Sequence, residues 1–271
     1  MEKRVAPQNP EQASMERVNV LGVGVSVLNQ AKAWEAIRWA IHDQRKGYIT
    51  ATGVHGVIDA QDDASLKQIF NASFLTTPDG MPMVWFGKLA GHREMDRVYG
   101  PDLMLAICDR GREYGFRHFF YGGKPGVADQ LKERLTARLP GLEVVGTYSP
   151  PFRSLNAGEE AALAATMAEV RPDITWIGLS TPKQDRFMAA FLDRLPTTLM
   201  IGVGAAFDFH SGQVRQAPGW IQRAGLEWFF RLCCEPRRLW RRYLSIVPRF
   251  IVLATLQQLG WRSFPSPWDS R

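Results

Sequence analysis

The sequence contains little cysteine and no uninterrupted apolar run of membrane-spanning length, and each shortage excludes a class of protein. Its cysteines, Cys108, Cys233 and Cys234, have neither the paired spacing of a zinc site nor the dense, even pattern of a secreted disulfide scaffold. The stretch from Leu244 to Leu259 is broken by Pro248 and falls short of about 20 apolar residues, so it should not span a bilayer. A cytoplasmic protein fits these absences best.

The N-terminal residues lack the apolar core that a signal peptide requires. Residues 1–17 are polar and mixed in charge, and we expect them to form a flexible arm. We find no internal repeat and no low-complexity run. With 271 residues and 45% apolar composition, the chain can bury the core of one large domain with a tail.

Patterns that bind a metal ion are missing as well. The five histidines have no close ligand spacing, and Asp62 and Asp63 are adjacent rather than alternating as in the D-x-D pair that holds a metal-bound nucleotide. Adjacent acids near a helix start are more often favourable partners of the helix dipole. We therefore predict no metal and no other cofactor.

Segments typical of strands and helices alternate from Val18 to Val203. This alternation predicts an α/β fold, a Rossmann-like and mostly parallel sheet with helices on both faces. The predicted strands are residues 18–28, 48–54, 74–80, 118–123, 142–148, 173–180 and 197–203, and the predicted helices are residues 31–45, 60–72, 101–114, 127–139, 158–170 and 183–195.

Ligands of such sheets bind beyond the carboxyl ends of the strands, so the residues at those ends are the first candidates for a site. Asp79 directly follows a predicted strand in the segment TTPDGMP. A carboxylate in this place suits a general base that takes the proton of an attacking hydroxyl. Pro-Asp-Gly is equally typical of a simple turn.

Other strand ends carry candidates for substrate binding. Gly122 and Gly123 in YGGKPGVADQL allow the backbone to approach a phosphate, although a tight strand-to-helix turn needs the same glycines. Gln184, at a helix start in STPKQDR, offers an amide to sugar hydroxyls or is an ordinary surface residue. Thr52 lies in the predicted strand YITATGV and His55 directly follows it, where His55 has either a binding or a structural role.

The net charge of +6 is concentrated in one segment. Between Arg215 and Arg249 there are eight arginines and no lysine, while Glu227 and Glu235 are the only acids, so this segment alone equals the whole excess. Tryptophan, phenylalanine and tyrosine alternate with these arginines. The combination suits an anionic membrane surface or a diphosphate, and the plainer alternative is a helix that packs its aromatic residues on the core.

These patterns divide the chain into three parts. We expect residues 1–17 to form the arm, residues 18–213 to form an α/β catalytic domain, and residues 214–271 to form an arginine-rich, membrane-associating appendage of short amphipathic helices.

Seven motifs then occur together in one order. They are ATGVHGVIDAQDD, FLTTPDGMPMVW, DRVYGPDLM, FFYGGKPGVA, RPDITWIGLSTPKQDRF, GVGAAFDFHSGQVRQAP and GLEWFFRLCCEPRRLWRRYL. In this order and spacing, residues 18–243 closely resemble the WecG/TagA/CpsF family of bacterial glycosyltransferases. The resemblance implies an inverting, metal-independent transfer of a sugar from a nucleotide donor, such as a UDP-sugar, to a polyprenyl-diphosphate-linked sugar.

The resemblance also implies residue roles. Asp79 becomes the candidate catalytic base, with Thr52, Arg97 and Gln184 as substrate contacts. The appendage is implied to close over the site at the inner face of the plasma membrane and to help neutralise the departing diphosphate. The full set of candidate substrate-binding residues is Thr52, His55, Arg97, Gln184, Gly122 and Gly123, and the candidates for the diphosphate and the membrane are Arg231, Arg237 and Arg238. A homo-oligomer is compatible with this assignment.

One departure from the family pattern bears on the donor sugar. Many members carry an asparagine shortly after the threonine of the first motif, where this chain reads Thr52, Gly53, Val54 and His55. The pattern looks closer to the exopolysaccharide, xanthan-type branch. A glucosyl or uronosyl donor therefore stands beside an N-acetylmannosaminyl donor.

Two other classes of protein share single features with this sequence. An NAD-dependent oxidoreductase would use the same sheet but would need G-x-G-x-x-G after the first strand, and LGVGVSVLN lacks the third glycine. A nucleic-acid-binding module would use the basic segment. The interleaved aromatic residues favour a membrane surface instead, so we expect no nucleic-acid partner.

Overall fold

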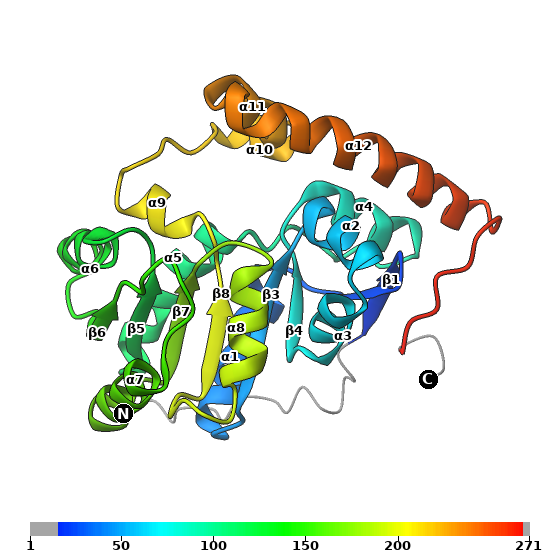
Figure 1. Ribbon diagram of the computed structural model, residues 1–271. Helices are drawn as coiled ribbons and strands as arrows, with labels where there is room; N and C mark the ends of the chain where they lie inside the picture. Colours follow the sequence, from blue (N-terminus) through cyan, green and yellow to red (C-terminus); the bar gives the residue numbers. More distant parts are fainter. Residues whose placement is uncertain (1–15, 268–271) are drawn as a thin grey trace.

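Six parallel strands form the central sheet of the computed structural model, which describes residues 16–267 except for the side chain of Arg238. The strand order is β4-β3-β8-β7-β5-β6 (Figure 1). The predicted α/β fold with a mostly parallel sheet is confirmed. The strands are β3 (Gly47–Thr52), β4 (Leu75–Pro78), β5 (Arg117–Gly122), β6 (Glu143–Tyr148), β7 (Ile174–Gly178) and β8 (Leu199–Gly202).

Helices cover both faces of this sheet. Alternate strand residues point to opposite sides, and both sets are apolar, so each face is buried under helices. Ile49 belongs to the core cluster on one face, and its neighbour Tyr48 belongs to the cluster on the other. The first cluster contains residues of α1 (Gln30–His42), α5 (Gly100–Gly111), α6 (Val127–Arg138) and α9 (Ala206–His210), and the second contains residues of α7 (Ala157–Val170) and α8 (Lys183–Phe191). A 3-10 turn, η1 (Arg112–Tyr114), follows α5.

The first predicted strand, residues 18–28, is wrong as a single strand of the parallel sheet. The chain folds back there as an antiparallel hairpin of β1 (Arg17–Val20) and β2 (Val23–Ser26), which forms a separate sheet. Leu21 and Gly22 at the turn have φ values of 53° and 84°, the left-handed conformations that a tight hairpin turn requires. Ser26 then anchors the hairpin, because its Oγ accepts a hydrogen bond from Thr76 N at 3.0 Å.

Of the predicted arm, residues 1–17, residues 1–15 lie outside the described part of the chain. Arg17, its last residue, is not part of an arm but opens β1. Its guanidinium donates to Ser73 O at 2.5 Å and to Thr76 Oγ1 at 3.2 Å. Burial lowers the pKa of Arg17 to about 10.

Two details of the helix prediction are corrected beside β4. The helix expected at residues 60–72 consists of α2 (Val54–Asp62) and α3 (Ala64–Ala72). Asp63 separates them and caps α3, since its carboxylate accepts from Leu66 N at 3.0 Å. A further helix that the pattern did not predict, α4 (Met81–Leu89), begins directly after Gly80 with a proline in its first turn.

The last part of the chain forms α10 (Gly219–Arg223), α11 (Glu227–Cys234) and α12 (Pro236–Gln258), with α12 running over α2 and α4 (Figure 1). The expectation of short helices is wrong for α12, which has 23 residues and continues through Pro248. No helix within residues 16–267 combines the length and apolarity needed to cross a bilayer. The division into catalytic domain and appendage at residue 213 stays a prediction.

Helix α12 shares a hydrophobic cluster with the hairpin. Phe250 and Leu253 are buried in this cluster together with residues of β1, β2, α2, α3 and α4. Gln257 adds polar contacts, because its Oε1 accepts from Leu21 N at 2.9 Å and its Nε2 donates to Asn19 O at 2.8 Å. The C-terminal helix is therefore packed into the body of the molecule.

We expect Phe250→Ala to lower the free energy of unfolding by about 3–5 kcal/mol, because the truncation leaves a cavity beside Phe86. The two rings lie 6.0 Å apart, and Phe250 is 7% exposed. Val252→Ala is the control, since Val252 is 57% exposed and its truncation should change stability by at most about 0.5 kcal/mol. Urea unfolding followed by circular dichroism measures both, and equal losses would contradict the packing of α12 described above.

Candidate functional site

A cavity of about 830 Å³ lies between the carboxyl ends of four strands and the last three helices. One wall comes from the segments that follow β3, β4, β7 and β8, and the opposite wall comes from α10, α11 and α12. The chain adds β4 on one side of β3 and all later strands on the other, so the strand order reverses beside β3. Open parallel sheets bind their ligands at such a reversal.

Asp79 stands in the cavity wall at the end of β4. Its N–H donates to Thr52 O at 3.1 Å, and its Oδ1 accepts from Gly100 N at 2.9 Å. Gly100 is the first residue of α5, so the carboxylate faces the positive end of that helix. The Gly100 bond engages Oδ1 and leaves Oδ2 as the oxygen that can take up a proton.

The surroundings of Asp79 act on its proton affinity in both directions. Burial raises the pKa of Asp79, and the negative charge of Glu227 adds to this effect. The N–H of Gly100 and the charge of Arg97 lower the pKa, but burial outweighs them. A carboxylate with a raised pKa accepts a proton more readily, which suits a general base.

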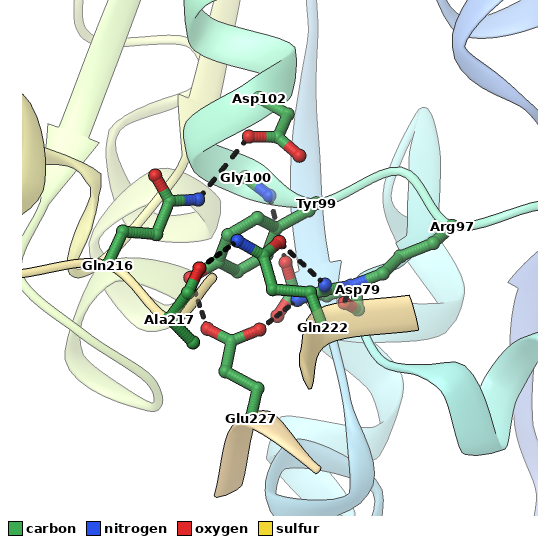
Figure 2. Close-up of polar contacts among 9 residues, drawn as sticks. All are labelled: Asp79, Arg97, Tyr99, Gly100, Asp102, Gln216, Ala217, Gln222 and Glu227. Atoms are coloured by element: carbon green, nitrogen blue, oxygen red, sulfur yellow. Dashed lines mark hydrogen bonds and ion pairs between the residues drawn. The ribbon is translucent and has the colours of Figure 1, made fainter. Parts of the chain in front are cut away.

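Arg97 is the centre of a polar network that joins Asp79 to the last helices (Figure 2). Its Nε donates to Asp79 O at 2.7 Å, its Nη1 donates to Gln222 Oε1 at 3.1 Å, and its Nη2 pairs with the Glu227 carboxylate. The Tyr99 hydroxyl donates to the same carboxylate at 2.5 Å. The Arg97 guanidinium also lies 3.9 Å from the centre of the Tyr99 ring. Arg97 is thus held in one orientation.

His55 makes a second link across the cavity. It lies in α2, and its Nε2 is 2.9 Å from Asp59 Oδ2 and contacts a guanidinium nitrogen of Arg242 in α12. Burial, together with the charges of Arg242 and Arg231, lowers the pKa of His55 to about 3. Arg242 can only donate, so Nε2 of His55 is the acceptor in this contact, and the lowered pKa favours the neutral imidazole that such a contact requires.

Two further candidates take different positions. Gln184 lines the cavity, and its Oε1 accepts from Gly204 N at 3.0 Å, so its NH₂ group is the end that can donate to a ligand. Thr52 is buried and is not among the lining residues. Its hydroxyl donates to Thr50 Oγ1 at 3.3 Å and its carbonyl holds the Asp79 backbone, so the structure gives Thr52 a positioning role.

Gly122 and Gly123 do not line this cavity. They end β5, which β8 and β7 separate from β3. Their φ values are 133° and 75°, and a Cβ on Gly122 would come within 2.6 Å of Gly178 O. The tight turn and the close strand contact therefore require these glycines, and a binding role for them stays a prediction.

Of the arginines predicted to bind the diphosphate and the membrane, only some line the cavity. Arg231 of α11 lines the cavity, and so does Arg242 of α12, which was not among the candidate residues. Arg237 is exposed and is not a lining residue. The side chain of Arg238 lies outside the described part of the chain.

Sequence reasoning missed Glu227, Tyr99, Gln222 and Arg242 as site residues. Glu227 is one of only two acids among the eight arginines between Arg215 and Arg249. A lone acid in such a basic segment indicates an ion pair with an arginine. Gln222 gives no such signal, because its partner Arg97 lies 125 residues away.

The described residues offer no group of three or more histidine, cysteine, aspartate or glutamate side chains that could hold a metal ion. Positive charge reaches the cavity instead through Arg97, Arg231 and Arg242. The predicted independence from metal stays a prediction.

Comparison with known proteins places this geometry in context. The sequence model of the "Glycosyl transferase WecG/TagA/CpsF family" matches residues 18–263. The chain is 31% identical over 210 residues to an N-acetylglucosaminyldiphosphoundecaprenol N-acetyl-beta-D-mannosaminyltransferase of Bacillus spizizenii (strain ATCC 23059 / NRRL B-14472 / W23), which covers 77% of this chain and 79% of the relative. A protein of the same name from Bacillus subtilis (strain 168) is 28% identical over 227 residues, which covers 83% of this chain and 86% of the relative.

We expect Asp79→Asn to be more stable than the natural protein at neutral pH. The folded state raises the pKa of Asp79 above its ordinary value of 3.8. The protonated carboxyl therefore contributes stability that is fully present below about pH 4 and is lost as the pH rises through the folded pKa. The stability advantage of the variant should grow over that interval and then level off. Urea unfolding of both proteins at a series of pH values measures it, and a difference that shrinks with pH would contradict the raised pKa.

Proposed function

Since the chain belongs to the WecG/TagA/CpsF family of glycosyltransferases, we propose that it transfers a sugar from a nucleoside-diphosphate donor to a polyprenyl-diphosphate-linked sugar, with inversion at the anomeric carbon. The observation that carries the proposal is that Asp79 shares one cavity with Arg231 and Arg242. The aspartate supplies a base and the arginines supply positive charge, and an inverting transfer needs both.

Asp79 is the general base of the proposed reaction. The acceptor hydroxyl oxygen attacks C1 of the donor sugar from the face opposite the diphosphate, while its proton passes to Oδ2 of Asp79. The bond between C1 and the diphosphate oxygen breaks, and its electron pair leaves with that oxygen. The raised pKa of Asp79 makes this proton transfer more favourable, provided that the pH keeps the carboxyl ionised.

Arg231 and Arg242 stabilise the leaving group. A departing nucleoside diphosphate gains negative charge in the transition state, and guanidinium groups form strong charge-assisted hydrogen bonds to phosphate oxygens. Neutral His55 orients the Arg242 guanidinium by accepting from it. Arg97, whose charge Glu227 balances, mainly fixes the Asp79 backbone and the last helices.

Family membership removes the support for the other classes of protein. An oxidoreductase with this sheet would hold its cofactor over the glycine-rich turn after its first strand, but here that segment is the β1–β2 hairpin. The basic segment, which also suits nucleic acid, lines the cavity beside Asp79 through Arg231 and Arg242.

The donor sugar is the open part of the specificity. The relatives are named as N-acetyl-beta-D-mannosaminyltransferases. The run from Thr52 to His55 places a glucosyl or uronosyl donor, in exopolysaccharide or cell-surface glycan synthesis, beside the N-acetylmannosaminyl donor. A panel of UDP-N-acetylmannosamine, UDP-glucose and UDP-glucuronic acid, each offered with polyprenyl-diphosphate N-acetylglucosamine, separates these donors.

Peripheral binding to the inner face of the plasma membrane brings the enzyme to its lipid-linked acceptor. Large apolar side chains are exposed on the last helices and beside them: Trp220, Phe229, Trp240 and Leu244 in α10 to α12, Trp261 after α12, and Trp85 and Leu89 in α4. Arg237 and other arginines of the same segment attract anionic headgroups, each adding on the order of 1 kcal/mol. Both features support a surface that lies on the bilayer.

We expect Asp79→Asn to reduce turnover by at least about a hundredfold, because base catalysis typically contributes about 10² to 10⁴ in rate. The measurement is transfer from the accepted UDP-sugar to the lipid-linked acceptor by the purified enzyme, in excess EDTA. Asp193→Asn is the control, since Asp193 is exposed at the far end of α8 and should retain full turnover. Near-normal turnover of Asp79→Asn would remove the base assignment.

We expect Trp240→Ala to weaken binding to vesicles that contain anionic lipid by about threefold or more. The exposed Trp240 ring would be buried in the bilayer, and a tryptophan ring contributes a large apolar area. Binding of the natural protein should also weaken as salt is added, since the arginines act through screened charge. Phe152→Ala is the control, because Phe152 is 87% exposed but follows β6 at the other edge of the sheet. Vesicle sedimentation measures both variants, and equal losses would argue against docking through the last helices.

A further inference from the structure

The cavity has two chemically different ends. Asp79, Arg97, Arg231 and Arg242 give one end its charge. The other end runs between α4 and the second half of α12, where the lining residues include Trp85, Phe86, Leu89, Val247, Ile251 and Leu259. Among the described lining residues of α4 and of positions 247–259, none is charged, and Thr255 and Gln258 are the only polar ones.

The cavity extends along α12, and its apolar end forms an arm of the cavity beside that helix. Arg242 and Leu259 both line the cavity from α12, and a rise of 1.5 Å per residue places their backbone positions about 25 Å apart. Arg249, which lies between them in sequence, is not a lining residue and forms an ion pair with Asp62 instead. The positive charge of α12 is thus kept out of this arm of the cavity.

The apolar arm is also open to the surface. Leu89 is 72% exposed, Ile251 57% and Leu259 54%, although all three line the cavity. An exposed apolar strip that lines a cavity marks a binding surface. A nucleotide sugar is polar over its whole length, so it would not be bound by such an apolar strip.

We propose that this arm binds the first isoprene units of the acceptor lipid, with the acceptor's diphosphate and sugar lying between the arm and Asp79. The inference rests on the proposed function and deepens it. An acceptor whose diphosphate joins a sugar to an isoprenoid chain matches the sequence of charged and apolar walls along the cavity. The chain then leaves between α4 and α12 at the exposed strip, which is continuous with the surface proposed to lie on the membrane.

The assignment makes acceptor recognition depend on the lipid as well as on the sugar. The enzyme can hold the near end of the chain in its own groove while the remainder stays in the bilayer. An acceptor with three isoprene units should therefore bind better than one with an ethyl group in the same place, even in a solution without membranes.

Adjacent residues of α12 provide a matched pair of variants. Ile251 and Val252 are each 57% exposed, but only Ile251 lines the cavity. At saturating donor, Ile251→Glu should raise KM for the three-isoprene acceptor about tenfold, which corresponds to about 1.4 kcal/mol, with kcat retained. Val252→Glu should leave that KM within about twofold of the natural value. With the ethyl acceptor, both variants should match the natural enzyme.

Different outcomes address the lipid groove and the proposed function separately. If the natural enzyme transfers sugar to both acceptors with the same KM, or if the two variants respond alike, the groove is refuted while the transferase stands. If the natural enzyme transfers sugar to neither acceptor with any donor of the panel, the proposed function itself fails. Thermal melting of both variants verifies that they are folded.

Photocrosslinking gives a second measurement that needs no turnover. A three-isoprene diphosphate sugar with a diazirine on its terminal unit should label peptides of α4 and of residues 247–259. Labelling should fall in Ile251→Glu and persist in Val252→Glu. Labels confined to other elements of the chain would overturn the proposal.

Discussion

The ion pair between Arg97 and Glu227 joins the loop that carries Asp79 to the helices that bring the arginines. Both side chains are largely buried, at 13% and 14% exposure. Loss of one partner would leave the other charge buried and unpaired, which typically costs about 3–5 kcal/mol. Because Arg97 also donates to Asp79 O, one guanidinium contacts both the Asp79 backbone and α11. This contact therefore helps to set the shape of the cavity.

The strand order explains which candidate residues meet at this contact. Asp79 and Gln184 reach the cavity because β4 and β7 lie close to the reversal beside β3. Gly122 has the same kind of position at a strand end, but β5 lies further across the sheet. Sequence pattern places residues at the ends of strands without giving the order of those strands. From the sequence alone, Gly122 and Asp79 are therefore equally good candidates for a site at the end of a strand.

Much of the fold follows from the pattern, and its failures have physical causes. The alternation of apolar strands and amphipathic helices was enough to predict the parallel sheet. It did not predict the β1–β2 hairpin. The turn residue Leu21 is apolar like the valines around it, so the sequence gives no sign of its left-handed φ. It also predicted only short helices in residues 214–271, whereas α12 continues through Pro248, where packing of Phe250 and Leu253 against the body outweighs the lost backbone bond. Glu227 and Arg97 are 130 residues apart, and no local pattern joins them.

The contacts between α12 and the β1–β2 hairpin have a consequence for biosynthesis. Leu21 and Gln257, which share a hydrogen bond, are separated by 236 positions in the chain. A ribosome adds residues at about 5–20 per second, so the hairpin waits on the order of ten seconds or more for its partner helix. During that interval the apolar side chains that α12 will cover are open to solvent or to a chaperone. The wall of the cavity that carries Arg231 and Arg242 is added only afterwards, so in a nascent chain Asp79 is present long before the arginines that share its cavity.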